Sequence, residues 1–155
     1  MNNLTPLKEE FLYELYATAL KQEHLCAILT KNMRSEYLPD RQFQRIQKCI
    51  SAHYQIYKSP PSYAVLMQTF NDDIEAVELI ETIREYDEGQ NVEVMTDMLE
   101  AYIKGVRLQK VYIEVGKLYN DQQQEKAEEV LRKYADWVAG FTLKSSSFVN
   151  VVLQD

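Results

Sequence analysis

The chain has 155 residues, a formal net charge of −7 and an apolar content of 46%. This length suits one domain, with room for two subdomains, and the acidic balance argues against a chain that grips phosphate backbones by itself. Only four glycines and four prolines interrupt a sequence rich in Lys, Glu, Gln and Leu, a composition that favours helix. We therefore expect an all-α protein that binds single-stranded DNA weakly at physiological salt.

The two cysteines, Cys26 and Cys49, both stand in helix-like sequence. Buried thiols are favoured over a disulfide, although an oxidising compartment stays open. No apolar run is long enough to span a membrane, and the Met1-Asn2-Asn3 start lacks the basic and apolar parts of a signal peptide. A cytoplasmic location is the expectation.

Residues 1–90 are predicted to form a globular helical subdomain. Its first helix is expected to begin at Thr5-Pro6, with Thr5 as the N-cap and Pro6 at the first helical position. A short second helix follows from Glu23 to about Lys31. Later helix starts are predicted from capping and proline-containing segments: Asp40, Ser59-Pro60-Pro61-Ser62 and Asn71-Asp72-Asp73. The hydrophilic loop 87–91 sets the predicted subdomain boundary.

Residues 91–141 are predicted to form a projecting antiparallel helical hairpin. The first arm runs from about Val92 to Tyr119, the polar segment 120–124 turns the chain, and the second arm runs from about Glu125 to Phe141. The first arm carries two apolar faces that point in nearly opposite directions. One face has Met95, Leu99, Tyr102 and Val106. The other has Leu108, Val111, Val115 and Leu118. An ordinary core helix within a single bundle is the alternative. Residues 142–155 are expected to be a linker.

The second arm carries a wide apolar stripe, which one packed helix cannot easily cover. We assign the flank with Leu131 and Val138 to packing inside the hairpin, where Leu131→Ala should open a cavity. We assign the other flank, together with Ile113 of the first arm, to a neighbouring subunit or partner. The predicted interface residues are Ile113, Val130, Tyr134, Trp137 and Phe141.

No catalytic, cofactor or metal site is predicted in this chain. Its four glycines are isolated, so no phosphate-cradling loop exists and ATP binding is not expected. His24 and His53 are too few and too isolated for a metal site. A small helical enzyme that uses buried carboxylates stays open as an alternative, because facing carboxylates cannot be recognised from one sequence.

Several segments, in this order and spacing, resemble the N-terminal domain of DnaB-like hexameric replicative DNA helicases, especially phage-type members. None of these helical segments is diagnostic alone, and the resemblance rests on their order. The segments are 11–15 (FLYEL), 40–46 (DRQFQRI), 57–66 (YKSPPSYAVL), 102–110 (YIKGVRLQK) and 125–131 (EKAEEVL).

The resemblance implies a non-catalytic collar domain that takes part in DNA replication in a bacterial cell or a phage host. Its hairpins would pair between subunits of a homo-oligomeric ring, and primase or a helicase loader would dock on the collar. ATP, Mg²⁺ and DNA would bind the parent helicase's ATPase domain, which would follow the linker 142–155 and is missing from this chain. The alternative is a stand-alone interaction module, such as a primase-type helicase-binding domain or a phage replication adaptor.

Overall fold

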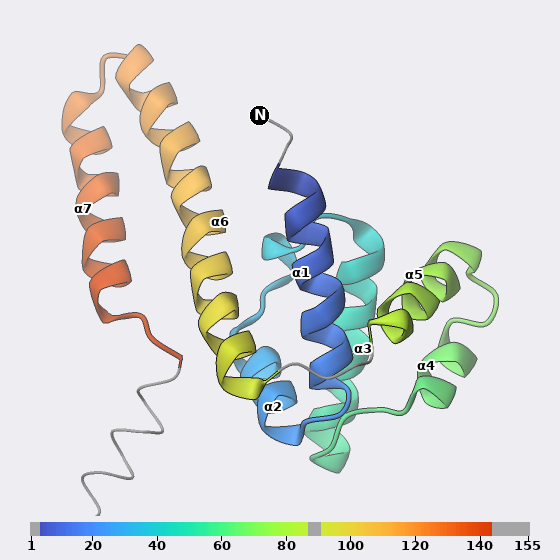
Figure 1. The fold of residues 1–155 in the computed structure, drawn as a ribbon. Helices are drawn as coiled ribbons and strands as arrows, with labels where there is room; N and C mark the ends of the chain where they lie inside the picture. The colour runs from blue at the N-terminus through green and yellow to red at the C-terminus, as the bar shows by residue number, and fades with distance from the viewer. Residues whose placement is uncertain (1–3, 87–90, 144–155) are drawn as a thin grey trace, which may run out of the picture. The chain divides into compact units, whose positions relative to one another are not determined.

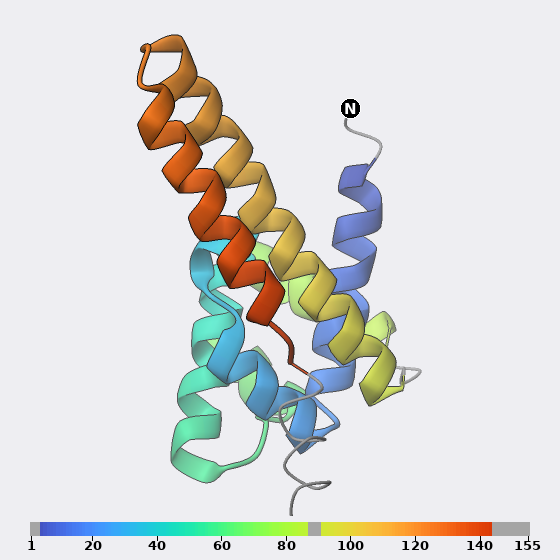
Figure 2. The same cartoon turned by 90° about the vertical axis from the view of Figure 1, so that its left-hand side faces the viewer.

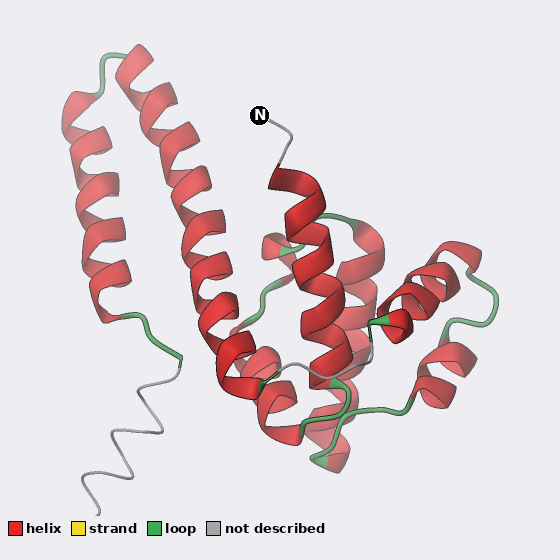
Figure 3. Cartoon of the chain, viewed as in Figure 1, coloured by secondary structure: helices red, strands yellow, loops and turns green. Residues whose placement is uncertain are grey.

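The computed structural model describes residues 4–86 and 91–143, which contain seven α-helices, one 3-10 helix and no strand (Figures 1 and 3). The all-α prediction is confirmed. The helices are α1 (Leu4–Ala19), α2 (Glu23–Asn32), η1 (Ser35–Tyr37), α3 (Arg41–Tyr57), α4 (Tyr63–Thr69), α5 (Ile74–Glu85), α6 (Val92–Asn120) and α7 (Gln124–Gly140). None of these described helices combines the length and apolar character that a membrane span requires.

The chain divides after Thr96 into two compact units, so that α6 begins in the first unit and continues in the second. The sequence places this boundary earlier, at residue 90. Most of the predicted boundary loop, 87–90, lies outside the described residues, and so do positions 144–155 of the predicted linker.

Three predicted helix starts are confirmed by side-chain caps. Each capping oxygen accepts a hydrogen bond from a backbone N–H three residues later, which satisfies one of the helix's unpaired donors. The pairs are Asp40 with Phe43 at 2.9 Å, Ser62 with Val65 at 3.2 Å and Asp73 with Ala76 at 3.1 Å.

The start of α1 differs from the prediction. The helix begins at Leu4, so Thr5 lies inside it instead of preceding it, and Pro6 is its third residue. Proline is tolerated there because the first-turn N–H groups of a helix have no acceptor within the helix.

The first unit buries apolar side chains between α1, α2, α3 and α5. Helix α3 contacts α2, η1 and α5, while α1 contacts α2 and α5, and α4 packs on α5. The largest fully buried side chains of this unit include Leu12, Leu15, Tyr16, Leu25, Leu29, Phe43, Ile46, Ile50, Leu66, Ile80 and Ile83. One polar pair lies in this core, where Tyr16 Oη donates to Gln47 Oε1.

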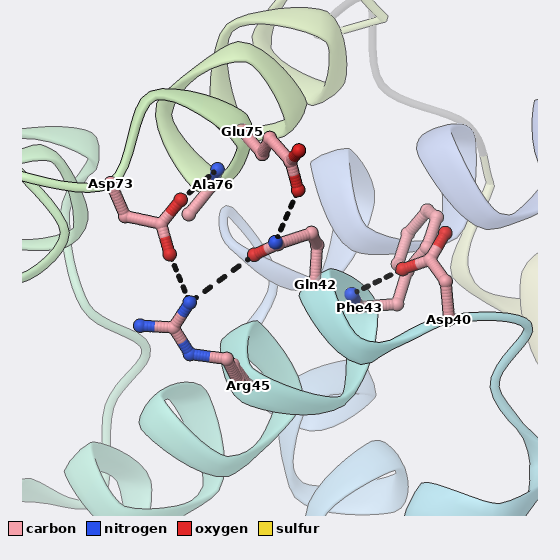
Figure 4. Close-up of polar contacts among 7 residues, drawn as sticks. All are labelled: Asp40, Gln42, Phe43, Arg45, Asp73, Glu75 and Ala76. Carbon is pink, nitrogen blue, oxygen red and sulfur yellow. Dashed lines mark hydrogen bonds and ion pairs between the residues drawn. The ribbon is translucent and has the colours of Figure 1, made fainter.

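A polar network joins α3 to the start of α5 (Figure 4). Asp73 caps α5 with one carboxylate oxygen and accepts a hydrogen bond from Arg45 of α3 with the other. Arg45 also donates to Gln42 at 3.3 Å, and Gln42 donates to Glu75 at 2.9 Å. The Arg45 guanidinium also lies 5.2 Å from the Phe70 ring centre. It therefore pairs with Asp73 through its charge and contacts the aromatic ring with its flat face.

Stability should depend on pH through Asp73. The hydrogen bond from Arg45, and then that from the Ala76 N–H, hold the pKa of Asp73 below its usual value. Ionised Asp73 therefore stabilises the fold above the pH range where an unfolded aspartate titrates, and this contribution is lost as the pH falls through the lowered pKa. Because asparagine caps helices as well as aspartate does, Asp73→Asn removes mainly the charge.

We expect the melting temperature of Asp73→Asn to lie below that of the wild type at pH 6–7, with the difference shrinking below about pH 4. Thermal melts across this pH range check it. Asp72→Asn removes the same charge from the exposed neighbouring residue and is the control. An equal deficit for Asp73→Asn at every pH would contradict the role given to its ionised form.

The second unit contains α6 from Asp97 onward and α7, which run in opposite directions (Figure 2). The turn lies at 121–123, inside the predicted polar segment. Gln123 N donates to Leu118 O at 2.8 Å and Gln122 N donates to Tyr119 O at 3.0 Å, which is the Schellman pattern of helix endings. Gln122 accordingly has a left-handed backbone, with φ of 61°.

Gln122→Gly should raise the free energy of unfolding by about 0.5–1 kcal/mol, because a left-handed backbone costs an L-residue energy that glycine avoids. Urea melts of both chains measure the difference. Gln123→Gly is the matched control, because Gln123 has φ of −109° and glycine there brings only extra freedom to the unfolded chain. Equal effects of the two substitutions would contradict the prediction.

Candidate interaction surface

The side of α7 that packs against α6 begins with Ala127, the one residue of α7 that is buried. Farther along α7, the same side of the helix carries aromatic residues instead of a small residue such as Ala127. Trp137 stacks on Phe141 with ring centres 4.6 Å apart, and its centre lies 5.9 Å from that of Tyr134. Spacings of three and four residues bring these three rings onto one face of α7, as the sequence pattern predicts.

Two contacts attach this aromatic group to α6. Tyr134 Oη donates to the backbone carbonyl of Lys104 at 3.0 Å. The guanidinium of Arg107 lies 3.9 Å from the centre of the Trp137 ring, which is close for a cation–π contact. Tyr134 and Trp137 therefore each have a contact inside the chain, whether or not a partner covers their remaining surface.

The end of α7 is tied back to α6 through Glu100. Its Oε1 accepts a hydrogen bond from Leu143 N at 2.8 Å, and its Oε2 lies 3.3 Å from Lys104 Nζ. Burial by itself would raise the pKa of Glu100, but hydrogen bonds from Leu143, Lys104 and Thr142 outweigh burial and lower it. An ionised Glu100 thus holds the segment that follows α7.

The five predicted interface residues fall into two groups. Val130, Tyr134 and Trp137 of α7 are half-buried, as is Phe141 directly after the helix, and the ring contacts given above bring Tyr134, Trp137 and Phe141 together. Ile113 lies on α6 and is 51% exposed. Val130, Tyr134 and Trp137 share the side of α7 that meets α6. Their assignment to a neighbouring subunit stays a prediction.

The assignment of Leu131 to the inside of the hairpin is wrong. Its side chain is 47% exposed, whereas Val130 beside it is half-buried and Ala127 is buried. Tyr134 and Trp137 contact α6 through the hydrogen bond to Lys104 and the stacking of Arg107, and Val138, which was assigned to the same flank as Leu131, is half-buried. The correction therefore applies to Leu131 alone.

Leu131→Ala is therefore expected to lower the free energy of unfolding by about 1 kcal/mol or less, since little apolar surface is buried there. Leu99→Ala, at a fully buried position of α6, should cost about 2–5 kcal/mol and is the reference. Chemical denaturation of the two variants measures the loss of unfolding free energy for each and so checks the difference between them. A cost for Leu131→Ala as large as that of the reference would restore the original assignment.

Glu100, Lys104 and Arg107 were not predicted from the sequence as residues of this surface. Their position in the sequence could have indicated this contact, because all three lie on the half of α6 that faces the end of α7 when the two helices run antiparallel. Arginine opposite a tryptophan is also a frequent pairing.

Two other chemical features of the described residues bear on function. No group of three or more His, Cys, Asp or Glu side chains in the described part of the chain is arranged to hold a metal ion. Cys26 and Cys49 are free thiols, the first buried and the second half-buried, as the sequence predicts. Burial raises the pKa of Cys26 to about 11 and also raises that of Cys49, which keeps both thiols protonated near neutral pH.

Comparison of the chain with family models, curated proteins and solved structures found no match.

Proposed function

We propose that the chain is a non-catalytic assembly and docking module, similar in role to the N-terminal collar domain of DnaB-like replicative helicases. In this role, copies of the chain associate with one another and hold primase or a helicase loader beside the helicase ring. ATP hydrolysis and DNA translocation would belong to an ATPase domain of the parent protein, where ATP and Mg²⁺ bind.

The observation that carries the proposal is the pair α6 and α7. A helix of 29 residues is followed by an antiparallel helix of 17 residues, and large apolar side chains on both stay exposed. Among these are Tyr112, Tyr119 and Leu131. Tyrosine is enriched in protein–protein interfaces.

The test separates a collar domain from a stand-alone helicase-binding module by the partner that each one binds. The full chain is immobilised and offered, in turn, the primase, the helicase loader and the intact replicative helicase encoded by the same genome. A collar domain is expected to bind the primase or the loader in a saturable manner. Binding of the helicase alone would favour the helicase-binding module, and binding of none of the three would contradict the proposal.

A further inference from the structure

Helices α3 and α4 lie in the longest stretch of the chain without an acidic residue. Residues 41–71 contain four bases and no acid, although the whole chain has 24 acids among 155 residues and a formal net charge of −7. The stretch spans α3, the loop with Pro60 and Pro61, and α4, all within the first unit. Such a local reversal of charge favours a partner of the opposite sign.

The bases of this stretch are mostly not engaged within the described part of the chain. Arg45 is engaged, because it donates to Asp73 at the start of α5 (Figure 4). Arg41, Lys48 and Lys58 are exposed, and no ion pair joins them to another described residue. Because Arg41 directly follows an acidic residue, Lys48 and Lys58 carry most of the uncompensated charge.

Apolar side chains share the exposed side of α3 with Lys48. At 100° per residue, Lys48, Ala52 and Ile56 fall within an arc of about 80°, nearly opposite the core residues of the helix. Ala52 is exposed and Ile56 is 70% exposed. Lys58 directly follows the helix and is exposed as well. The end of α3 therefore presents an aliphatic side chain between two lysines.

Helix α4 runs along α3 in the opposite direction, as three contacts show. The Arg45 guanidinium lies 5.2 Å from the Phe70 ring centre, the Cys49 side chain is hydrogen-bonded to that of Thr69, and His53 Nδ1 lies 3.0 Å from the Ser59 carbonyl oxygen. Val65 lies one turn before Thr69 on the same face of α4 and is 41% exposed. Ile56 follows Cys49 by two turns on α3, so Val65 and Ile56 lie on the same side of the two helices. We call the following set the α3–α4 surface: Lys48, Ala52, Ile56, Lys58 and Val65.

The chemistry that complements the α3–α4 surface is acidic and apolar. Carboxylates complement the two lysines, and a large apolar side chain removes Ile56 and Val65 from water, which is favourable. Lys48 and Lys58 are separated by about 15 Å along the helix axis, and an extended segment of about five residues spans that distance. A short segment of a partner protein is therefore long enough to cover the surface.

A strand of nucleic acid fits the same surface less well. The aliphatic side chains of Ile56 and Val65 offer no aromatic ring on which a base stacks. The basic surface is also short, because Asp72 and Glu75 line one hollow together with Arg45 farther along α3. A long polyanion would meet these carboxylates, and charges within the Debye length of about 8 Å at physiological salt repel it.

We infer that the α3–α4 surface binds a short acidic segment of a partner protein, with carboxylates beside Lys48 and Lys58 and a large apolar side chain over Ile56 and Val65. The inference goes beyond the proposed function and does not rest on it, because it uses residues of the first unit alone.

The chemistry of the partner is tested by selection from a library of random peptides displayed on phage, with the full chain immobilised. Peptides of about ten residues are longer than the surface when extended. The selected peptides are expected to be rich in Asp and Glu and to carry Leu, Ile or Phe among them. A selected set without acidic residues, or with acidic residues and no large apolar ones, would overturn the inference.

The place of binding is tested by fluorescence anisotropy with a labelled peptide from the selection and variants of the full chain. Lys48→Glu and Ile56→Ala should each raise the dissociation constant at least about tenfold, because each removes one half of the complementary contact. Lys126→Glu makes the same charge change at an exposed position of α7, and Leu131→Ala truncates an aliphatic side chain that is 47% exposed. These two controls should leave the dissociation constant unchanged. Equal weakening by surface variants and controls would overturn the assignment.

Two further measurements test the other occupants of the surface. Oligothymidylate that binds more tightly than the selected peptide, and loses this binding in Lys48→Glu, would identify nucleic acid as the occupant. Self-association that is lost in Ile56→Ala, measured by sedimentation equilibrium, would identify a second copy of the chain. Either result would overturn the inference and leave the proposed function standing, whereas the experiment with primase, loader and helicase decides that function separately.

Discussion

Phe43→Ala is expected to lower the free energy of unfolding by about 3–5 kcal/mol. Phe43 is 2% exposed and lies in the first turn of α3, directly after the Asp40 cap. Its ring centre is 5.8 Å from those of both Tyr13 and Tyr16 on α1, so one side chain joins two helices. Truncation would leave a cavity that neighbouring rings cannot fill without leaving their rotamers.

The matched control is Ile56→Ala on the same helix. Ile56 is 70% exposed, so its truncation should change stability by about 0.5 kcal/mol or less. Both variants are compared with the wild type by urea denaturation monitored by circular dichroism. Similar midpoints for the two variants would mean that Phe43 is not a central residue of the core.

The parts of the fold that could be predicted from the sequence are those decided by neighbouring residues. A capping side chain and its helix start lie within four positions of each other, so Asp40, Ser62 and Asp73 could be identified without knowledge of the tertiary structure. The all-α class follows in the same way from helical periodicity in every segment. The α1 start was less clear because two adjacent residues, Leu4 and Thr5, are each compatible with the first turn.

The candidate site was predicted only in part. That Tyr134, Trp137 and Phe141 share a face of α7 follows from spacing alone. Which flank of that face meets α6 does not, because an apolar stripe is equally compatible with packing on either side. The structure decides it through Lys104 and Arg107, which are distant in sequence and polar, and for that reason Leu131 was assigned to the wrong environment.

Apolar periodicity also does not predict a buried glutamine. Gln47 is 3% exposed, and both the oxygen and the nitrogen of its amide are hydrogen-bonded. Its Oε1 accepts a hydrogen bond from Tyr16, and its Nε2 donates to Ser51 Oγ at 2.8 Å. A polar side chain is stable at such a position only when its hydrogen bonds are satisfied, and the partner on α1 is 31 residues away in sequence.

Tyr16→Phe should therefore cost about 1–3 kcal/mol of stability, although it removes only one oxygen atom. The loss comes from Gln47, whose amide oxygen would stay buried without the hydrogen bond from Tyr16. Gln47→Leu should cost a similar amount for the converse reason, since it leaves the tyrosine hydroxyl without this acceptor. Tyr57→Phe, at a 65% exposed position of α3, removes the same atom where water replaces it, and is the control.

The double variant separates the hydrogen bond from other effects of the two substitutions. When both groups are removed together, no buried donor or acceptor of this pair is left unpaired, so the double variant should lose less stability than the two single losses added. Urea melts of the wild type, the two single variants and the double variant give the coupling free energy between Tyr16 and Gln47, which is expected to be about 1 kcal/mol or more. Strict additivity would show that the α1–α3 contact derives its stability from apolar packing alone, and that Gln47 is tolerated in the core without contributing to it.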